Sequence, residues 1–148
     1  MQLLPGARIS IEQMKTGFHI PRNGIDCEGL PFAVSVKFGW DTRYYNIAGR
    51  GPHRLYQGRT YLNADGQTIE WGDNKKLVET LHRNQPVRVM DELVGKKKVK
   101  YVGLFNVLQV FEDLKNKEFY FLLETVDGTE EPISDEIKNR TAKMVRRI

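Results

Sequence analysis

Cysteine is almost absent from this chain, since Cys27 is the only one among 148 residues. A single cysteine cannot form an internal disulfide framework or a thiolate zinc site. Apolar runs are also short: none approaches the roughly 18 residues of a membrane-spanning helix, and the opening Met-Gln-Leu-Leu-Pro-Gly is not a signal peptide. These absences predict a soluble domain in the reducing cytoplasm, with no membrane partner.

Catalytic and cofactor-binding patterns are missing as well. The histidines His19, His53 and His82 are scattered, and the chain has neither a phosphate-binding loop nor a glycine-rich dinucleotide fingerprint. Glu136 and Lys138 have the Glu-x-Lys spacing of some nucleases, but no acidic strand precedes them. We therefore expect a binding domain, not an enzyme, with no metal and no cofactor.

Length and charge indicate one domain but do not identify its partner. The chain has the usual length of a domain with its own core, and it contains no repeat or low-complexity linker. A net charge of +4 and a pI of about 9.2 suit a polyanion, but surface lysines explain such values equally well. We expect a single domain over residues 1–148, whose basic C-terminal tail is a point where a longer protein would continue.

The hydrophobic pattern predicts a β-rich fold. Alternating apolar residues predict a strand over 32–38, and further strands are expected over 87–93, 99–111 and 119–126. Residues 39–58 are dense in Gly, Asn, Asp and aromatic residues, which favours long loops with short strands.

Helices are expected at the margins of this sheet. Asp73 is a suitable N-cap for a helix over 74–84, and Ser134 or Asp135 caps a final helix before a basic, helix-like tail. The apolar stripe of the first helix consists of Leu77, Val78 and Leu81. The fold class predicted is α+β and β-dominated: a twisted or barrel-like sheet with two or three peripheral helices.

Aromatic residues concentrate in one window. Both tryptophans and five of the six tyrosines lie between Gly39 and Phe105, beside loops that contain Asn and Asp. Aromatic faces next to positioned carboxylates and amides are suited to holding an unstacked nucleobase. Each ring taken singly is more readily explained as a strand-core residue, so the clustering and the order of the motifs carry the functional interpretation.

The order of these motifs resembles that of the SRA (SET- and RING-associated, or YDG) superfamily, in particular its bacterial members. The resemblance covers roughly half of the chain. The motifs that carry it are Gly39-Trp40-Asp41, Tyr61-Leu62-Asn63-Ala64-Asp65-Gly66-Gln67, Gly72-Asp73-Asn74-Lys75-Lys76-Leu77, Pro86-Val87-Arg88-Val89 and Tyr101-Val102-Gly103-Leu104-Phe105.

This resemblance implies a PUA-like barrel that recognises modified cytosine, such as 5-methylcytosine, in duplex DNA by base flipping. It implies a targeting module of a modification-dependent restriction system, with any nuclease or motor in another domain or subunit. Asp41 is suited to accept a hydrogen bond from the exocyclic amine of cytosine. Leu62 stands where the family has threonine, and it either provides an apolar wall for a methyl group or points into the barrel. The base pocket expected consists of Trp40, Asp41, Tyr44, Tyr45, Tyr56, Tyr61, Leu62 and Asn63.

Cationic residues near this window are expected to contact the DNA backbone, although Lys96 to Lys98 are equally suited to solvating a hairpin turn. Two other functions are compatible with the same sequence: a PUA-like RNA-binding module, and a barrel that binds a protein or a small ligand. Only the nucleic-acid functions predict steep salt dependence. The backbone contacts expected are Arg50, Arg54, Arg59, Lys96, Lys97, Lys98 and Lys100.

Overall fold

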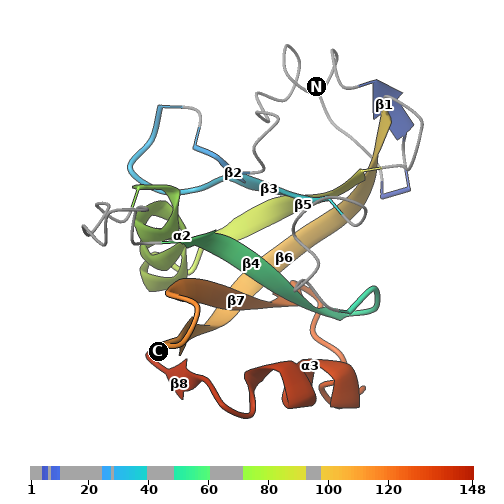
Figure 1. Cartoon of the computed structure of the whole chain (residues 1–148). Coiled ribbons are helices and arrows are strands. Elements are labelled where there is room, and N and C mark those ends of the chain that lie inside the picture. The colour runs from blue at the N-terminus through green and yellow to red at the C-terminus, as the bar shows by residue number, and fades with distance from the viewer. Residues whose placement is uncertain are drawn as a thin grey trace.

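A computed structural model describes residues 5–6, 8–10, 25–27, 29–39, 49–60, 72–92 and 98–148. Within these residues, eight strands form one strongly twisted sheet, and two helices lie at its margins (Figure 1). The expected β-dominated α+β class is therefore confirmed. The elements are β1 (Arg8–Ser10), β2 (Ile25–Asp26), β3 (Ser35–Phe38), β4 (His53–Thr60), α2 (Gly72–His82), β5 (Pro86–Glu92), β6 (Lys98–Asp113), β7 (Glu118–Thr125), α3 (Asp135–Thr141) and β8 (Val145–Arg146).

The strands follow the order β2-β3-β5-β6-β7-β4 across the sheet, and β1 and β8 pair with β6 off this path. β3 and β5 are parallel, whereas the other described pairs are antiparallel. The 16-residue β6 is the central strand of the sheet. β5 and β8 pair along one of its edges, and β1 and β7 pair along the other.

Two bulges allow β6 to bend between these partners. Val102 is the extra residue of the first bulge, opposite β5, and Leu108 is the extra residue of the second, opposite β7. Gly103 follows the first bulge with a φ of 140°, a conformation that glycine adopts readily and other residues rarely do. Because bulges increase the local bend and twist of a strand, β6 can pair with strands in both halves of a curled sheet.

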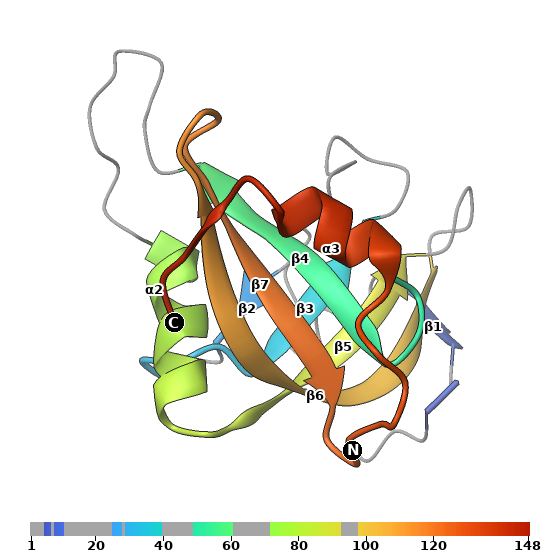
Figure 2. The ribbon, with the colours of Figure 1, turned by 90° about the horizontal axis from the view of Figure 1, so that it is seen from below.

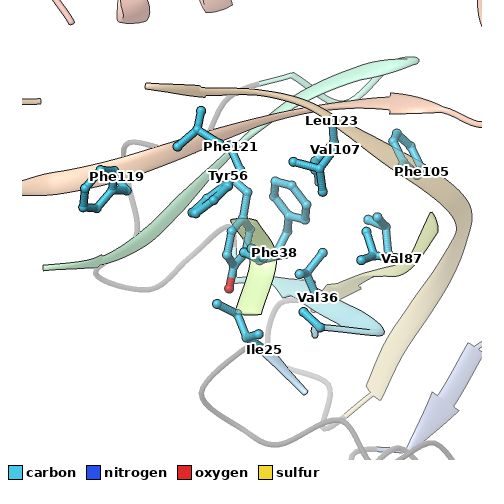
Figure 3. Close-up of a cluster of buried hydrophobic side chains, with 14 residues drawn as sticks. Ile25, Val36, Phe38, Tyr56, Val87, Phe105, Val107, Phe119, Phe121 and Leu123 are labelled. Atoms are coloured by element: carbon cyan, nitrogen blue, oxygen red, sulfur yellow. The ribbon is translucent and has the colours of Figure 1, made fainter. Parts of the chain in front are cut away.

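The inner face of the sheet holds the main core. Phe38 of β3, Phe105 of β6 and Phe121 of β7 are at most 1% exposed and meet there (Figure 3). Leu77 of α2 is fully buried against the same cluster, so the helix covers part of this core. The three strands and the helix are thereby fixed relative to one another.

A smaller apolar cluster lies on the outer face of the sheet. Leu55 of β4 and Tyr120 and Leu122 of β7 pack against Ile137 of α3, and Figure 2 shows α3 alongside β4. β7 is therefore buried on both faces, which explains its continuous apolar run.

The two predicted helices are present, with shifted bounds. α2 begins at Gly72, two residues before the predicted start, so Asp73 lies within its first turn and not at the position that precedes the helix. It ends before Asn84, whose φ of 53° is left-handed, as in many helix C-terminal caps. Ser134 caps α3 as expected, because its side chain accepts a hydrogen bond from the Ile137 amide at 3.3 Å.

The C-terminal tail does not continue as a helix. After α3 the chain forms β8, which pairs with β6 at Phe111 and Glu112. The Arg147 guanidinium lies 2.6 Å from the Glu112 carboxylate, and Ile148 packs against the main core. These contacts join residues about 35 positions apart, so the helix-like local pattern is overridden by tertiary pairing.

The prediction that residues 39–58 form mainly loops was wrong for their second half. β4 is an eight-residue strand that pairs with β7, and Leu55 and Tyr56 are buried on its opposite faces. Polar residues at 54 and 57 are buried as well, which removes the apolar–polar alternation by which a strand is recognised.

Gly58 allows β4 and α2 to approach each other. A Cβ at this position would overlap the Asn74 side-chain oxygen and would lie 2.9 Å from the Phe121 ring. Asn74 is itself only 1% exposed, so it has little room to move. A glycine is therefore required here by the contact between the strand and the helix.

Substituting Gly58→Ala is expected to lower the free energy of unfolding by about 1–3 kcal/mol, because the added methyl group overpacks this contact. Urea denaturation measures the change. Gly51→Ala is the matched control, since a Cβ there has no atom within 4 Å. The control should change stability by less than about 0.5 kcal/mol, and equal losses in both variants would contradict the close contact.

Candidate nucleic-acid interface

Most of the predicted site residues lie outside the described residues. Arg59 lies in β4, and its backbone alone is described. Arg50, Arg54, Tyr56, Lys98 and Lys100 are described with their side chains. The predicted residues that lie outside are Trp40, Asp41, Tyr44, Tyr45, Tyr61, Leu62, Asn63, Lys96 and Lys97.

Tyr56 belongs to the main core in this structure. It is 5% exposed, and its ring meets the Phe38 ring edge-to-face with centroids 5.1 Å apart. In Figure 3 its hydroxyl points toward Ile25 of β2. The ring therefore supports the inner face of the sheet and is not exposed to a base in this structure.

Arg54 does not face solvent, so its assignment as a DNA-backbone contact is corrected. Its side chain is 3% exposed, and its Nη1 and Nη2 atoms lie 2.5 and 3.2 Å from the two carboxylate oxygens of Asp91. The guanidinium also lies over the Phe38 ring, 5.2 Å from its centroid. A cation that is buried and doubly paired in this way is not available to a phosphate.

The two segments that hold the predicted base pocket begin at different ends of β4. Residues 40–48 follow β3 and return to the sheet at Gly49, just before β4 begins, whereas residues 61–71 follow its last residue, Thr60. An eight-residue strand spans about 23 Å at about 3.3 Å per residue. The points at which the two segments join β4 are therefore separated by the length of that strand.

A row of cations lies near the end of the sheet from which residues 40–48 depart. Phe38 pairs with Asp91, Asp91 with Lys100, and Lys100 with Arg8, across β3, β5, β6 and β1. Residues directly opposite across strands have side chains on the same face, so Lys100 and Arg8 continue the inner face beyond the buried Arg54–Asp91 pair.

This basic row, defined as Arg8, Lys98 and Lys100, is exposed to solvent. Asp91, which lies opposite Lys100 in β5, is paired with Arg54, so its charge is already balanced within the sheet. Like charges directly opposite each other destabilise a sheet, and an anion bound between Arg8 and Lys100 would relieve that repulsion. The arrangement favours a polyanionic partner.

Sequence reasoning identified Lys98 and Lys100 but missed Arg8. The register that places Arg8 opposite Lys100 joins positions separated by most of the chain. No local pattern in the first ten residues indicates this pairing. Arg50, also predicted to contact DNA, is exposed beside the return of segment 40–48.

The described residues give no sign of a metal site or a membrane span. Within them, no group of three or more His, Cys, Asp or Glu side chains is arranged to hold a metal ion. No helix in the same part of the chain is long and apolar enough to cross a membrane.

One carboxyl group on the outer face has a shifted pKa. Burial raises the pKa of Glu118 above its ordinary value of 4.5, and the Tyr120 hydroxyl, which donates a hydrogen bond at 2.8 Å, offsets part of this rise. Because the folded state then binds the proton more tightly than the unfolded chain, this group stabilises the fold below the ordinary pKa. That stabilisation is lost as the pH rises through the folded-state pKa.

Glu118→Gln is expected to remove this pH dependence. As the pH is raised from about 4 to about 7, the unfolding free energy of the variant should increase relative to that of the wild-type protein. The reason is that only the wild-type side chain acquires a poorly solvated charge. Urea denaturation across this range measures the difference. A difference that shrinks with rising pH would contradict the assignment.

Comparison with known proteins identifies the fold. No family model matches the sequence, and no curated protein is significantly similar to it. The structure is similar to the SRA domain of SUVH5 in complex with hemi-methylated CG DNA, with a TM-score of 0.67 and 20% identity over 90% of this chain and 96% of that chain. It is similar to the SUVH5 SRA domain bound to fully hydroxymethylated CG DNA, with a TM-score of 0.62 and 21% identity over 89% of this chain and 95% of that chain.

A restriction enzyme contains the same fold. The modification-dependent TagI restriction endonuclease matches with a TM-score of 0.62 and 20% identity over 83% of this chain. The chain spans 50% of the length of that enzyme. The fold of this chain is thus the SRA fold, as the order of its sequence motifs predicted.

Proposed function

We propose that this domain binds duplex DNA that carries a modified cytosine and serves as the targeting module of a modification-dependent restriction system. The observation that carries the proposal is the SRA fold over 90% of the chain, shared with a domain in complex with methylated DNA. The similarity to TagI, a modification-dependent restriction endonuclease, supports the assignment to restriction. Cleavage or translocation would reside in another domain or subunit.

The chemistry of recognition follows from the residues of segments 40–48 and 61–71. A protein cannot contact every edge of a base inside a duplex, so the base is rotated out of the helix at a cost of a few kcal/mol. The base then stacks on aromatic rings, and each stack contributes about 1–3 kcal/mol of binding free energy. Two of the rings at Trp40, Tyr44, Tyr45 and Tyr61 would suffice, because Tyr56 already belongs to the core. Asp41 accepts a hydrogen bond from the cytosine amine, and the backbone amides of residues 63–67 read the remaining edge.

The discrimination of a methyl group is expected to be modest. Burying one methyl group against an apolar wall, for which Leu62 is the candidate, contributes about 0.8 kcal/mol. Unmodified DNA should therefore still bind, roughly fourfold more weakly.

Affinity for the duplex is assigned mainly to the basic row, with Arg50 beside it. Arg59, Lys96 and Lys97 remain candidates for the same role. Each phosphate neutralised lowers the slope of log K against log salt by about 0.9. Three contacts by the basic row alone predict a slope near −2.7, or roughly a 40-fold loss of affinity for a fourfold increase in salt.

A salt titration of DNA binding tests this proposal. Arg8→Ala and Lys100→Ala are each expected to reduce the slope by about 1 and to weaken binding to every duplex by a similar factor. Lys138→Ala is the matched control, because Lys138 is exposed on α3, which covers the outer face. Binding that does not change with salt, or an equal effect of the control, would contradict the interface.

A further inference from the structure

The chain that leads into α3 and the chain that leads out of it carry opposite charges. The acidic segment, residues 127–136, contains five carboxylates and no cation, whereas the basic segment, residues 138–147, contains five cations and no carboxylate. All ten charged residues are exposed to solvent. The carboxylates belong to Asp127, Glu130, Glu131, Asp135 and Glu136, and the cations to Lys138, Arg140, Lys143, Arg146 and Arg147.

The fold separates the two segments along one face of the domain. Ile137, which lies between them in sequence, is 1% exposed and fixes α3 to the outer face of the sheet. In Figure 2 the chain enters α3 at one end and leaves it at the other toward the C-terminus. The basic segment is held at its far end by β8, which pairs with β6. The outer face therefore has a negative end and a positive end.

The stability of α3 explains only part of this pattern. Carboxylates in the first turn of a helix and cations in its last turn compensate the helix dipole, which accounts for Asp135, Glu136 and Arg140. The dipole acts only within about one turn, so it does not explain the three carboxylates before the helix or the three cations after it. Within the residues that the structure describes, none of the five carboxylates forms an ion pair.

A surface with this pattern is complementary to itself. In a dimer with two-fold symmetry, the same patch of both copies forms the interface, so that residue i contacts residue j and residue j contacts residue i. If the two α3 helices run antiparallel, each acidic segment lies against the basic segment of the other copy, and both contacts are attractive. A polyanion such as DNA fits this face less well, because the acidic segment repels phosphates.

We propose that the acidic and basic segments of the outer face form a docking surface for a second copy of this chain. Exposed ion pairs are individually weak, so the association depends on the ten charges acting together and is reversible. Because the outer faces meet in such a dimer, both inner faces remain free, together with the basic rows on them. Given the proposed function, the dimer would hold two duplex segments, one on each side.

Sedimentation equilibrium of the DNA-free protein tests this interaction. The wild-type protein should form dimers at low salt. The dissociation constant of the dimer should rise about tenfold between about 10 and about 100 mM salt, because the Debye length falls from about 30 to about 10 Å.

Two charge-reversal variants locate the interface. Each keeps one segment unchanged and reverses the net charge of the other, so neither variant should dimerise alone. An equimolar mixture should dimerise, because the unchanged basic segment of one variant attracts the unchanged acidic segment of the other. The acid-side variant combines Asp127→Lys, Glu130→Lys and Glu131→Lys, and the base-side variant combines Lys138→Glu, Lys143→Glu and Arg146→Glu.

The matched control has the same net charge as the base-side variant but an unchanged outer face. It combines Lys75→Glu of α2 with Lys98→Glu and Lys100→Glu of the basic row. The control should dimerise like the wild-type protein, and an equal loss in the control would place the effect on net charge or on the inner face and would overturn the docking surface. Far-UV circular dichroism confirms that each variant is folded.

The other outcomes separate this interaction from DNA binding. Wild-type protein that stays monomeric at low salt, or a mixture of folded variants that does not dimerise, would overturn the docking surface and leave the proposed function intact. A base-side variant that reduces the salt slope of DNA binding by about 3, with no change in oligomeric state, would assign the basic segment to phosphate contacts instead. Equal binding of all duplexes by the wild-type protein would refute the proposed function and leave the dimer unaffected.

Discussion

Replacing Asp91 with asparagine is expected to lower the free energy of unfolding by about 3–5 kcal/mol, the usual cost of breaking a buried ion pair by removing one partner. The Asp91 side chain is 14% exposed and that of Arg54 is 3% exposed, so water cannot take over the solvation of the guanidinium. Asparagine keeps the shape of the side chain and removes only its charge. Chemical denaturation of wild-type and variant protein measures the loss.

An exposed ion pair of the same chain provides the control. Arg83, which directly follows α2, and Glu79 of α2 are 3.0 Å apart, with side chains 45% and 41% exposed. Glu79→Gln should cost no more than about 0.5 kcal/mol, as is typical of solvated i,i+4 pairs. If Asp91→Asn costs as little as this control, the Arg54–Asp91 pair does not anchor the end of the sheet.

The second large effect is expected at Leu77, where alanine should cost about 2–5 kcal/mol by leaving a cavity in the main core. Leu77 is the fully buried residue through which α2 packs against the inner face of the sheet. Thermal or urea denaturation measures this loss.

Lys75 is the control on the same helix, because it is exposed and close in sequence. Lys75→Ala should change the unfolding free energy by less than about 0.5 kcal/mol, since alanine is also a good helix former. Similar losses of unfolding free energy in the Leu77 and Lys75 variants would indicate that α2 is stabilised by its intrinsic helix propensity and not by packing against the sheet.

Elements with a regular apolar pattern could be predicted from the sequence. The spacing of Leu77, Val78 and Leu81 predicted the buried stripe of α2, and all three pack against the main core. β5, β6 and β7 were predicted within one or two residues of their bounds, because their apolar residues alternate or run continuously. The SRA fold followed from the order of motifs, most of which belong to these regular elements.

Elements that depend on distant partners could not be predicted. β4 was missed because Arg54 and Gln57 are buried polar residues, and the carboxylate that pairs with the buried Arg54 belongs to Asp91, 37 positions away. The short β1 and β8 exist because β6 offers free edges to them, which no local pattern indicates. The composition of the candidate site was the least predictable from the sequence, because the site joins Arg8 of the first ten residues to Lys100 in the middle of the chain.

The most direct test of the proposed function is a binding panel of otherwise identical duplexes that differ at one base. The duplexes carry cytosine, methylcytosine, hydroxymethylcytosine, glucosylated cytosine or methyladenine, and binding is measured at a salt concentration that suppresses non-specific affinity. We predict that at least one modified cytosine is bound more tightly than cytosine, by about fourfold for the methyl group, and that methyladenine gives no such gain. Equal affinity for all five duplexes would contradict the recognition of modified cytosine.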